Sequence, residues 1–295
     1  MKATRLLLIQ SLLFLFGTTL HGQMISNQTG QAFTDHEFFN DNFIRNNKIK
    51  TIQGSYSFKK NGDLIRKVPG SYTFTFDHAG QLASIVDLKW NGKKLDTLVN
   101  YFSYSEKGDL ISFKKSEYGG ITEQEMTYDS IDRLTKITNY RVSLDNKGNT
   151  IKRVEINQES IQYNGEKKTR YNSYGLPYLI SFETYDEDGY KIASQEKLKR
   201  SGTISENKYT YTEKGLLKQI LTFYDKKTDP VQTISFSYDA FGNMTERLEK
   251  KMNTLVKDLQ VIFDTKTQLL HSIIRRNPNT NFMAIIRFTT YDYFD

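Results

Sequence analysis

The stretch Tyr72-Thr-Phe-Thr-Phe-Asp-His-Ala-Gly-Gln-Leu82 contains one full unit of the pattern that decides the fold. Its aromatic residues alternate with threonines, and this period of two is typical of a half-buried strand. Asp77 then occupies the first position of a type I turn, where a short acceptor side chain is favoured. Gly80 occupies the fourth position, where a positive φ is tolerated. Leu82 begins a return strand, so the stretch predicts a β-hairpin.

The same unit occurs ten times, as an anchor residue followed four positions later by glycine or a substitute for it. Nine of the ten anchors are aromatic. The ten pairs are Phe58-Gly62, Phe76-Gly80, Tyr104-Gly108, Tyr128-Asp132, Leu144-Gly148, Tyr171-Gly175, Tyr185-Gly189, Tyr211-Gly215, Tyr238-Gly242 and Phe263-Thr267. Further turn signals, such as Asn91-Gly92, lie between the pairs. Because an internal repeat fixes the architecture, the chain is predicted to be all-β. We expect an antiparallel meander of hairpins that forms one long twisted or curved sheet, preceded by a short N-terminal helix.

The acidic residues of the repeat are interpreted as turn chemistry. In nine of the ten copies the first turn position holds a short polar side chain that can accept hydrogen bonds from nearby backbone N–H groups. We therefore assign a structural role in turns, and no catalytic role, to Asp77, Gly80, Gly108, Asp129, Gly148, Gly175, Asp186, Gly189, Gly215, Asp239 and Gly242.

Residues 1–22 have the features of a secretory signal peptide. Lys2 and Arg5 form a basic region, an apolar run follows, and small residues precede Gln23. The apolar run is short for a membrane anchor, so an uncleaved tether is the less favoured alternative. No second apolar run of spanning length follows, and no membrane span is expected after cleavage.

Cysteine is absent from the whole chain. Lipid attachment at a cleavage-site cysteine and a disulfide framework are both excluded for that reason. We expect an exported protein, periplasmic or extracellular, that is not a lipoprotein. Its fold depends on burial, for which a mature chain of this length suffices.

Residues 23–50 carry no repeat and are interpreted as an N-terminal capping segment, with the repeat domain in residues 51–295. Thr34-x-x-Glu37 matches a capping box. Four apolar residues are spaced to share one face of a short helix: Phe38, Phe39, Phe43 and Ile44. We expect this helix to cover the open edge of the first strand, as terminal caps do in repeat proteins.

Two copies, Tyr128-Asp-Ser-Ile-Asp-Arg-Leu-Thr and Tyr238-Asp-Ala-Phe-Gly-Asn-Met-Thr, resemble YD repeats, the units of the RHS-repeat family. The resemblance covers about Phe58 to Leu270. It implies a continuous β-sheet, which in very long members of the family spirals into a hollow shell around a toxin. Here Asp229-Pro230 is not followed by the boundary sequence of long members, and too few residues follow the last repeat for a toxin domain. The chain is also too short to close a shell, so the resemblance implies an exported β-repeat scaffold.

Catalytic motifs are scarce. The mature chain has three histidines, His36, His78 and His271, and none stands at a metal-ligand spacing. There is no nucleophile elbow, phosphate loop or dinucleotide fingerprint. Asp186-Glu-Asp-Gly189 lacks the later ligands of a calcium loop and lies in a turn position. We expect no cofactor and no metal.

Aromatic residues are abundant, with 19 tyrosines and 19 phenylalanines. Most are repeat anchors and are expected in the core or in cross-strand pairs. The others could form a platform for sugar rings. Trp90 is the candidate ligand contact, because it directly precedes a turn, although a core position is the simpler interpretation.

Positive charge is concentrated in doublets near predicted turns: Lys59-Lys60, Lys93-Lys94, Lys114-Lys115, Lys167-Lys168, Lys226-Lys227, Lys250-Lys251 and Arg275-Arg276. Such doublets are typical of solvated turns and of protected strand edges. The sharper alternative is a face that binds a polyanion. The partner is then an acidic polysaccharide or an envelope protein, and no nucleic acid is expected.

Two classes of function stay open. The first is a non-catalytic protein with a binding or structural role at the cell envelope or outside the cell. The second is a carbohydrate-active protein, an enzyme or a polysaccharide binder, that uses acidic and aromatic residues on the sheet. A concave groove with apposed acidic side chains outside the turn positions would favour an enzyme. Acidic residues confined to turns would favour binding.

The signal peptide makes a direct prediction. The exported protein should begin at Gln23, because the small residues and the end of the apolar run both lie just before it. Intact-mass measurement checks this, and a mass that still includes the apolar run would contradict it.

Overall fold

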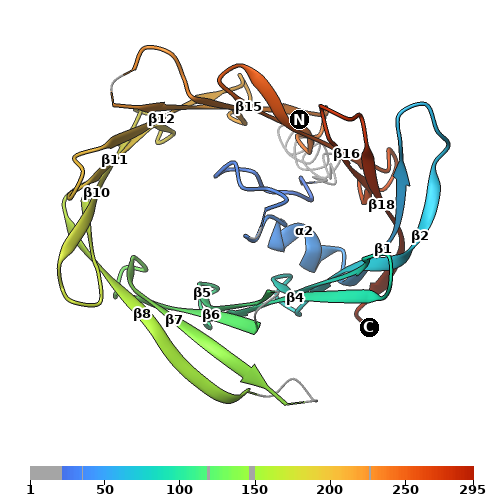
Figure 1. Cartoon of the computed structure of the whole chain (residues 1–295), viewed down its shortest axis with the longest axis horizontal. Coiled ribbons are helices and arrows are strands. Elements are labelled where there is room, and N and C mark those ends of the chain that lie inside the picture. Colours follow the sequence, from blue (N-terminus) through green and yellow to red (C-terminus); the bar gives the residue numbers. More distant parts are fainter. Residues whose placement is uncertain (1–21, 35, 118–119, 146–149, 226) are drawn as a thin grey trace, which may run out of the picture.

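The protein forms one closed β-barrel of 18 antiparallel strands, drawn in Figure 1 from a computed structural model. The structure describes residues 22–295 except 35, 118–119, 146–149 and 226. Each strand pairs with the next one in sequence, and β18 (Met283–Tyr293) pairs with β1 (Ile49–Lys59). The sheet therefore has no open edge.

The other strands are short, and tight turns connect most of them. Their bounds are β2 Arg66–Phe76, β3 Leu82–Trp90, β4 Leu95–Tyr104, β5 Leu110–Glu117, β6 Gly120–Tyr128, β7 Leu134–Leu144, β8 Thr150–Asn164, β9 Lys167–Tyr171, β10 Pro177–Tyr185, β11 Lys191–Leu198, β12 Ile204–Tyr211, β13 Leu217–Tyr224, β14 Gln232–Tyr238, β15 Met244–Lys251, β16 Thr254–Phe263 and β17 Leu270–Arg276. The helix α2 spans Asp41–Asn46.

The predicted all-β antiparallel meander is confirmed, but the expected open sheet is wrong, because the sheet closes on itself. Bulges account for the curvature that closure requires, since a bulge bends a strand and increases its twist. In nine hairpins the strand register shifts at the repeat anchor: Phe76, Tyr104, Tyr128, Leu144, Tyr171, Tyr185, Tyr211, Tyr238 and Phe263. The repeat thus encodes a bulge as well as a turn.

The two ends of the barrel differ. The even-numbered strands finish at one end, which also receives the N-terminal segment, and we call it the plug end. Seven repeat turns lie there, those that follow β2, β4, β6, β10, β12, β14 and β16. The opposite, open end carries the turns of Gly62 and Gly175. Gly148 lies outside the described residues.

The repeat turns have the hydrogen bonds that short acceptor side chains form. Asp77 accepts a bond from the Gln81 N–H at 2.9 Å. Bonds from two backbone N–H groups reach each of Asp129, Asp186 and Asp239. Positive φ angles occur at Gly80, Gly108, Gly175, Gly189, Gly215 and Gly242. These residues shape the loops between strands.

Tyrosine hydroxyls tie neighbouring strands together at the plug end. Tyr104 donates to the carbonyl of Leu82 at 3.0 Å, and Leu82 is the first residue of the preceding strand. Equivalent bonds run from Tyr128, Tyr163, Tyr211, Tyr238 and Tyr291. Burial raises the pKa of all six phenols, so they stay protonated donors. This role explains why tyrosine is the commonest anchor.

Residues 23–47, which we call the N-terminal plug, lie inside the barrel (Figure 1). The ring of Phe39 contacts those of Phe74 and Phe76, each at 4.8 Å between centroids. Elsewhere on the wall, at the turn before β15, the Met24 N–H donates to Asn243 Oδ1 at 2.9 Å. The plug therefore joins separate arcs of the wall.

Two expectations about the N-terminal segment are wrong: the capping box at Thr34, and the position of the helix over the edge of the first strand. Thr34 donates its hydroxyl to the Gln31 carbonyl, and α2 begins after Asn40, whose side chain accepts a bond from the Phe43 N–H. Phe39 lies before the helix and forms a β-bridge with Ile25. Because the closed sheet offers no strand edge to cover, these apolar residues fill the lumen instead.

Among the described residues, no helix is both long and apolar enough to cross a membrane.

Replacing Gly80 with alanine should lower the free energy of unfolding by about 2–4 kcal/mol, since strain at its φ of 86° adds to a collision. An added Cβ would lie 2.2 Å from the Asp41 carbonyl oxygen and 2.8 Å from the Arg45 nitrogen. Gly175→Ala is the matched control. Its φ is 72° and nothing lies within 4 Å of an added Cβ, so it should cost only about 1 kcal/mol. Equal losses in chemical denaturation would contradict the docking of α2 on this turn.

Candidate functional site

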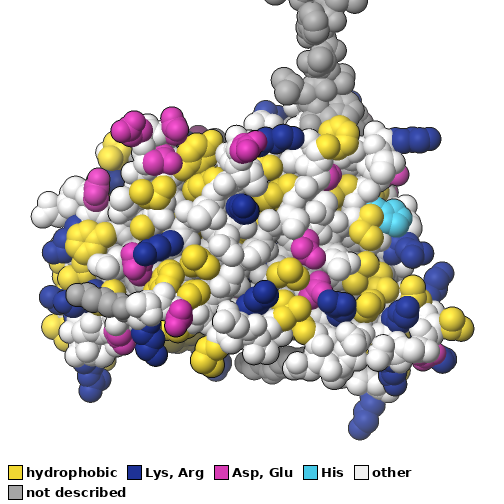
Figure 2. Space-filling view, turned by 90° about the horizontal axis from the view of Figure 1, so that it is seen from above, with side chains coloured by type: hydrophobic (Ala, Val, Ile, Leu, Met, Phe, Trp, Pro, Cys, Tyr) yellow, Lys and Arg dark blue, Asp and Glu magenta, His cyan; other side chains and the backbone are white. Residues whose placement is uncertain are grey.

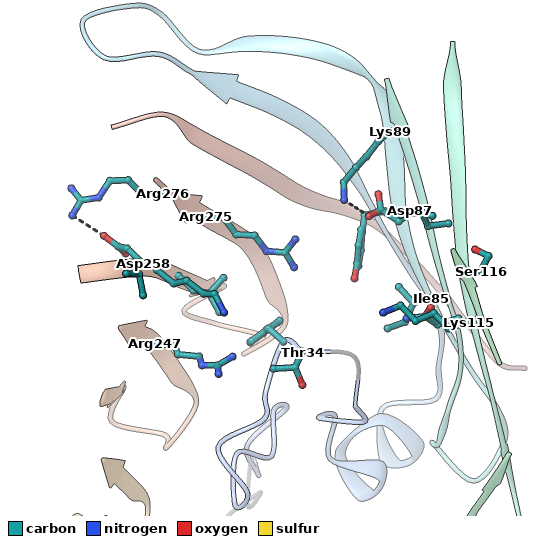
Figure 3. Close-up of a pocket in the computed structure, with 17 residues that line it drawn as sticks. Thr34, Ile85, Asp87, Lys89, Lys115, Ser116, Arg247, Asp258, Arg275 and Arg276 are labelled. Carbon is teal, nitrogen blue, oxygen red and sulfur yellow. Dashed lines mark ion pairs between the residues drawn. The ribbon is translucent and has the colours of Figure 1, made fainter. Parts of the chain in front are cut away.

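A cavity of about 570 Å³ opens between the plug and two facing arcs of the wall (Figure 3). One arc is formed by β2 to β5 and the other by β15 to β17. Its lining residues are Phe33, Thr34, Tyr72, Ile85, Asp87, Lys89, Leu98, Asn100, Lys115, Ser116, Arg247, Val256, Lys257, Asp258, Leu259, Arg275 and Arg276. Since the charged residues stand near the open-end termini of their strands, we call this cavity the open-end chamber.

The chamber is positively charged, with six basic residues in its lining and two acidic ones. Arg247 and Arg275 point into it from one wall, while Lys89 and Lys115 approach from the opposite wall (Figure 3). Lys257 adds a further ammonium group. Fields of like sign add in a concave site with low-dielectric walls, so the chamber attracts anions.

Asp87 is fully engaged by its neighbours. Its carboxylate accepts a bond from the Tyr56 hydroxyl at 2.5 Å and forms an ion pair with Lys89 at 2.5 Å. The side chain is buried, and burial together with this hydrogen bond raises the pKa of Tyr56. Asp87 therefore orients Lys89 and has both carboxylate oxygens engaged by protein groups.

Glu249 neutralises a second lysine at the edge of the chamber. Its buried carboxylate lies 2.9 Å from the Lys257 ammonium and accepts a bond from the Gln232 amide at 2.9 Å. Arg276 forms an ion pair with Asp258 at 2.7 Å. These pairs leave the two other arginines as the least compensated charges.

Neither Arg247 nor Arg275 has an ion pair within 4 Å among the described residues. Arg247 Nε is buried without a hydrogen-bond partner. Burial lowers the pKa of Arg247, and the charge of Glu249 opposes this shift. A buried donor without a partner is costly, and such groups are characteristic of sites that bind a ligand. We regard the two guanidinium groups as the centre of the candidate site.

The strand pleat separates the members of two basic doublets. Adjacent residues of a strand point to opposite faces. Arg275 therefore points into the chamber, while Arg276, which also lines it, is directed toward Asp258 and pairs with it. Lys115 likewise lines the chamber, whereas Lys114 contacts Glu123 at 3.8 Å.

Most of the basic doublets lie at the open end of the barrel, as the directions of their strands show. The doublets at this end, in strand termini or turns, are Lys59-Lys60, Lys93-Lys94, Lys114-Lys115, Lys250-Lys251 and Arg275-Arg276. Lys167-Lys168 begins β9 at the plug end. Lys226 lies outside the described residues.

The candidates named from sequence lie outside the chamber. None of the assigned turn residues lines it. Trp90 is 45% exposed at the end of β3 but is not part of the lining. His78 stacks on Phe294 with 4.0 Å between ring centroids. Among the described residues, no three His, Cys, Asp or Glu side chains gather as metal ligands do.

Sequence reasoning missed Arg247 and Asp87 altogether. Neither belongs to a doublet or a motif, and only closure of the barrel brings their strands face to face. The doublets did contain a signal for Lys115 and Arg275, since both are members of such pairs.

The lumen is concave and holds acidic residues outside the turns. An enzyme would also require that such acidic side chains face one another. Asp41 of α2 has acidic neighbours, since burial and the charges of Asp77 and Glu37 raise its pKa to about 6. Asp87, Glu183 and Glu249 each contact a lysine ammonium group. Burial would raise the pKa of Glu183, but hydrogen bonds from Lys168 and Lys191 lower it to about 2, so this carboxylate is a poor general acid.

No protein-family model matches the sequence. No curated protein matches it either. Among solved structures, a porin-like protein from Bacteroides uniformis shares 12% identity at a TM-score of 0.39, over 83% of this chain and 98% of that one. A porin-like protein from Bacteroides vulgatus shares 9% at 0.27, over 80% and 96%. A TcdB2-TccC3 structure shares 12% at 0.30, over 74% of this chain but 15% of its own. Likeness at this level assigns no family, and the YD-repeat resemblance stays a prediction.

Replacing Arg247 with methionine should raise the free energy of unfolding by about 1 kcal/mol, because it removes a half-buried charge without an ion pair among the described residues. Methionine also keeps apolar contact with Phe236 and Leu259, the cross-strand neighbours of Arg247. Arg275→Met is the control, since this exposed side chain should change stability by less than about 0.5 kcal/mol. Urea denaturation measures both. Clear destabilisation by Arg247→Met would show that the arginine supports the fold.

Proposed function

We propose that this protein is an exported, non-catalytic binding protein that holds an anionic ligand in the open-end chamber. The observation that carries the proposal is the pair of arginines, Arg247 and Arg275. Both point into the cavity without an ion pair among the described residues, while nearby acids are engaged by other basic side chains. Functional sites often retain charged groups that lower the stability of the fold. Guanidinium groups also match carboxylate and sulfate groups, to which they donate two parallel hydrogen bonds.

The ligand class that fits best is an acidic polysaccharide. A cavity of about 570 Å³ is within the usual size for a small-ligand site and is open enough to admit part of a longer chain. The surrounding doublets at the open end would extend the positive field beyond the chamber. Repeating carboxylates of a uronic acid polymer would meet both features at once.

The outer wall supports a role in an aqueous compartment. Along β1 the residues that alternate with the buried ones are Thr51, Gln53, Ser55 and Ser57. Figure 2 shows one side of the molecule, where basic, acidic and apolar side chains are interspersed. Many apolar residues of the repeat instead surround the plug, whereas others, such as Leu64 and Tyr185, are exposed. Together with the predicted signal peptide, this favours the periplasm or the cell exterior.

The experiment is retention of the mature protein on immobilised alginate and on neutral dextran across a salt series. Alginate should retain the protein at low salt and release it as salt rises. The reason is that salt screens the attraction between charges beyond a distance of about 10 Å at 0.1 M. Dextran should give no salt-dependent retention.

Two double variants test whether the protein binds alginate in the chamber. Arg247→Gln with Arg275→Gln should weaken retention on alginate at least tenfold, about the effect of losing two charged hydrogen bonds. Lys214→Gln with Lys266→Gln removes the same charge from two plug-end turns and should change little. If both double variants weaken retention equally, the attraction comes from net charge and the chamber is not the site. Equal retention of the native protein on both polymers would contradict the anionic ligand.

A further inference from the structure

A second cavity lies at the plug end, between the plug and the wall formed by β10 to β14. Its volume is about 450 Å³, and it shares no lining residue with the open-end chamber. Four tyrosines line it: Tyr185, Tyr190, Tyr211 and Tyr238. The plug contributes three amide side chains, those of Gln23, Asn27 and Gln28. The composition is thus aromatic and amide-rich.

Two of the aromatic rings are available to a ligand. Tyr185 is 50% exposed and Tyr190 is 39% exposed. The Tyr190 ring packs on Tyr211 with 4.9 Å between centroids. Its hydroxyl lies over the Gly215 turn, where an added Cβ would approach it to 2.2 Å. The Tyr190 ring is therefore held in one orientation, as a stacking surface must be.

Two of the three amides are also available. Asn27 is engaged, since its nitrogen donates to the Tyr238 hydroxyl and its oxygen accepts from the Ala32 N–H. Gln23 and Gln28 form no hydrogen bond with other described residues, and Gln28 is exposed. Each offers a donor and an acceptor side by side, which is the pattern that two neighbouring hydroxyl groups satisfy.

The cavity carries little net charge. Lys191 is its single basic residue, and no carboxylate lines it. The Lys191 ammonium lies 2.7 Å from Glu183, which also contacts Lys168. Burial alone would raise the pKa of Glu183, but hydrogen bonds from Lys168 and Lys191 lower it to about 2. Glu183 is therefore ionised and holds the Lys191 ammonium in an ion pair that it shares with Lys168.

We infer that this plug-end cavity is a binding site for an uncharged sugar ring. Apolar C–H faces of a sugar stack on tyrosine rings, and its hydroxyls pair with the amides of Gln23 and Gln28. An anion would find one ammonium group, that of Lys191, and Glu183 already holds it in an ion pair. A purely apolar ligand would strip water from the amides without replacing their hydrogen bonds. The inference does not depend on the open-end chamber.

The test is a calorimetric titration of the mature protein with three neutral hexasaccharides: maltohexaose, cellohexaose and laminarihexaose. At least one should bind with a Kd of about 1 mM or tighter. Its affinity should be the same at low and high salt, because no net charge is neutralised on binding. Failure of all three to bind would overturn the inference.

Variants test the location. Tyr190→Ala should weaken binding at least tenfold, and Tyr174→Ala, at an 87% exposed tyrosine of the open end, should leave it unchanged. Because Tyr190→Ala also frees space over the Gly215 turn, Gln28→Ala serves as a second variant. It should weaken binding about threefold or more, without a change in the thermal midpoint, as expected for one lost hydrogen bond.

Two further outcomes would count against the site. Sugar binding that survives both Tyr190→Ala and Gln28→Ala takes place elsewhere. Sugar binding that is lost in the Arg247→Gln and Arg275→Gln double variant belongs to the chamber. Retention on alginate without hexasaccharide binding would leave the proposed function standing and remove only this inference.

Discussion

The pairing of β1 with β18 is the constraint on which the rest of the structure depends. It runs from Ile49 opposite Tyr293 to Lys59 opposite Met283 and removes both edges of the sheet. A barrel of 18 strands is too wide for its own side chains to fill, as the aqueous lumens of barrels of this size show. Closure therefore creates an interior that needs a further occupant. The N-terminal plug fills the interior at one end of the barrel, and water or ligands occupy the rest of the interior.

The plug gives the two ends different chemistry. At the plug end, repeat turns such as that of Gly80 pack against the backbone of α2, and tyrosine hydroxyls tie the strands. Apolar burial is concentrated there, around Phe39 and Phe74. At the open end the plug does not fill the lumen, and charged side chains line it instead. The basic chamber is thus a consequence of where the apolar plug stops.

Local features of the fold could be predicted from the sequence, because alternation and turn chemistry act over a few residues. The strand of Tyr72 and the acceptor role of Asp77 follow from such short-range rules. Closure could not be predicted in the same way. Closure results from small bends at successive bulges, such as that at Tyr104. The sequence pattern does not show whether these bends add up to a closed barrel. For the same reason Arg247 and Asp87 were missed, since they line one cavity only when the barrel closes.

A cysteine cross-link across the seam tests the closed barrel most directly. Ser55 and Arg287 are paired in register and both are exposed, and paired positions of this kind are close enough for a disulfide. The native chain has no cysteine, so the Ser55→Cys and Arg287→Cys thiols are the only two present. Under mild oxidation at low protein concentration, we predict an intramolecular disulfide in nearly all molecules, seen as loss of thiol labelling by intact mass. In an open sheet the two strands would stand at opposite edges, about 80 Å apart. Thiols that stay reactive in the folded monomer would contradict closure.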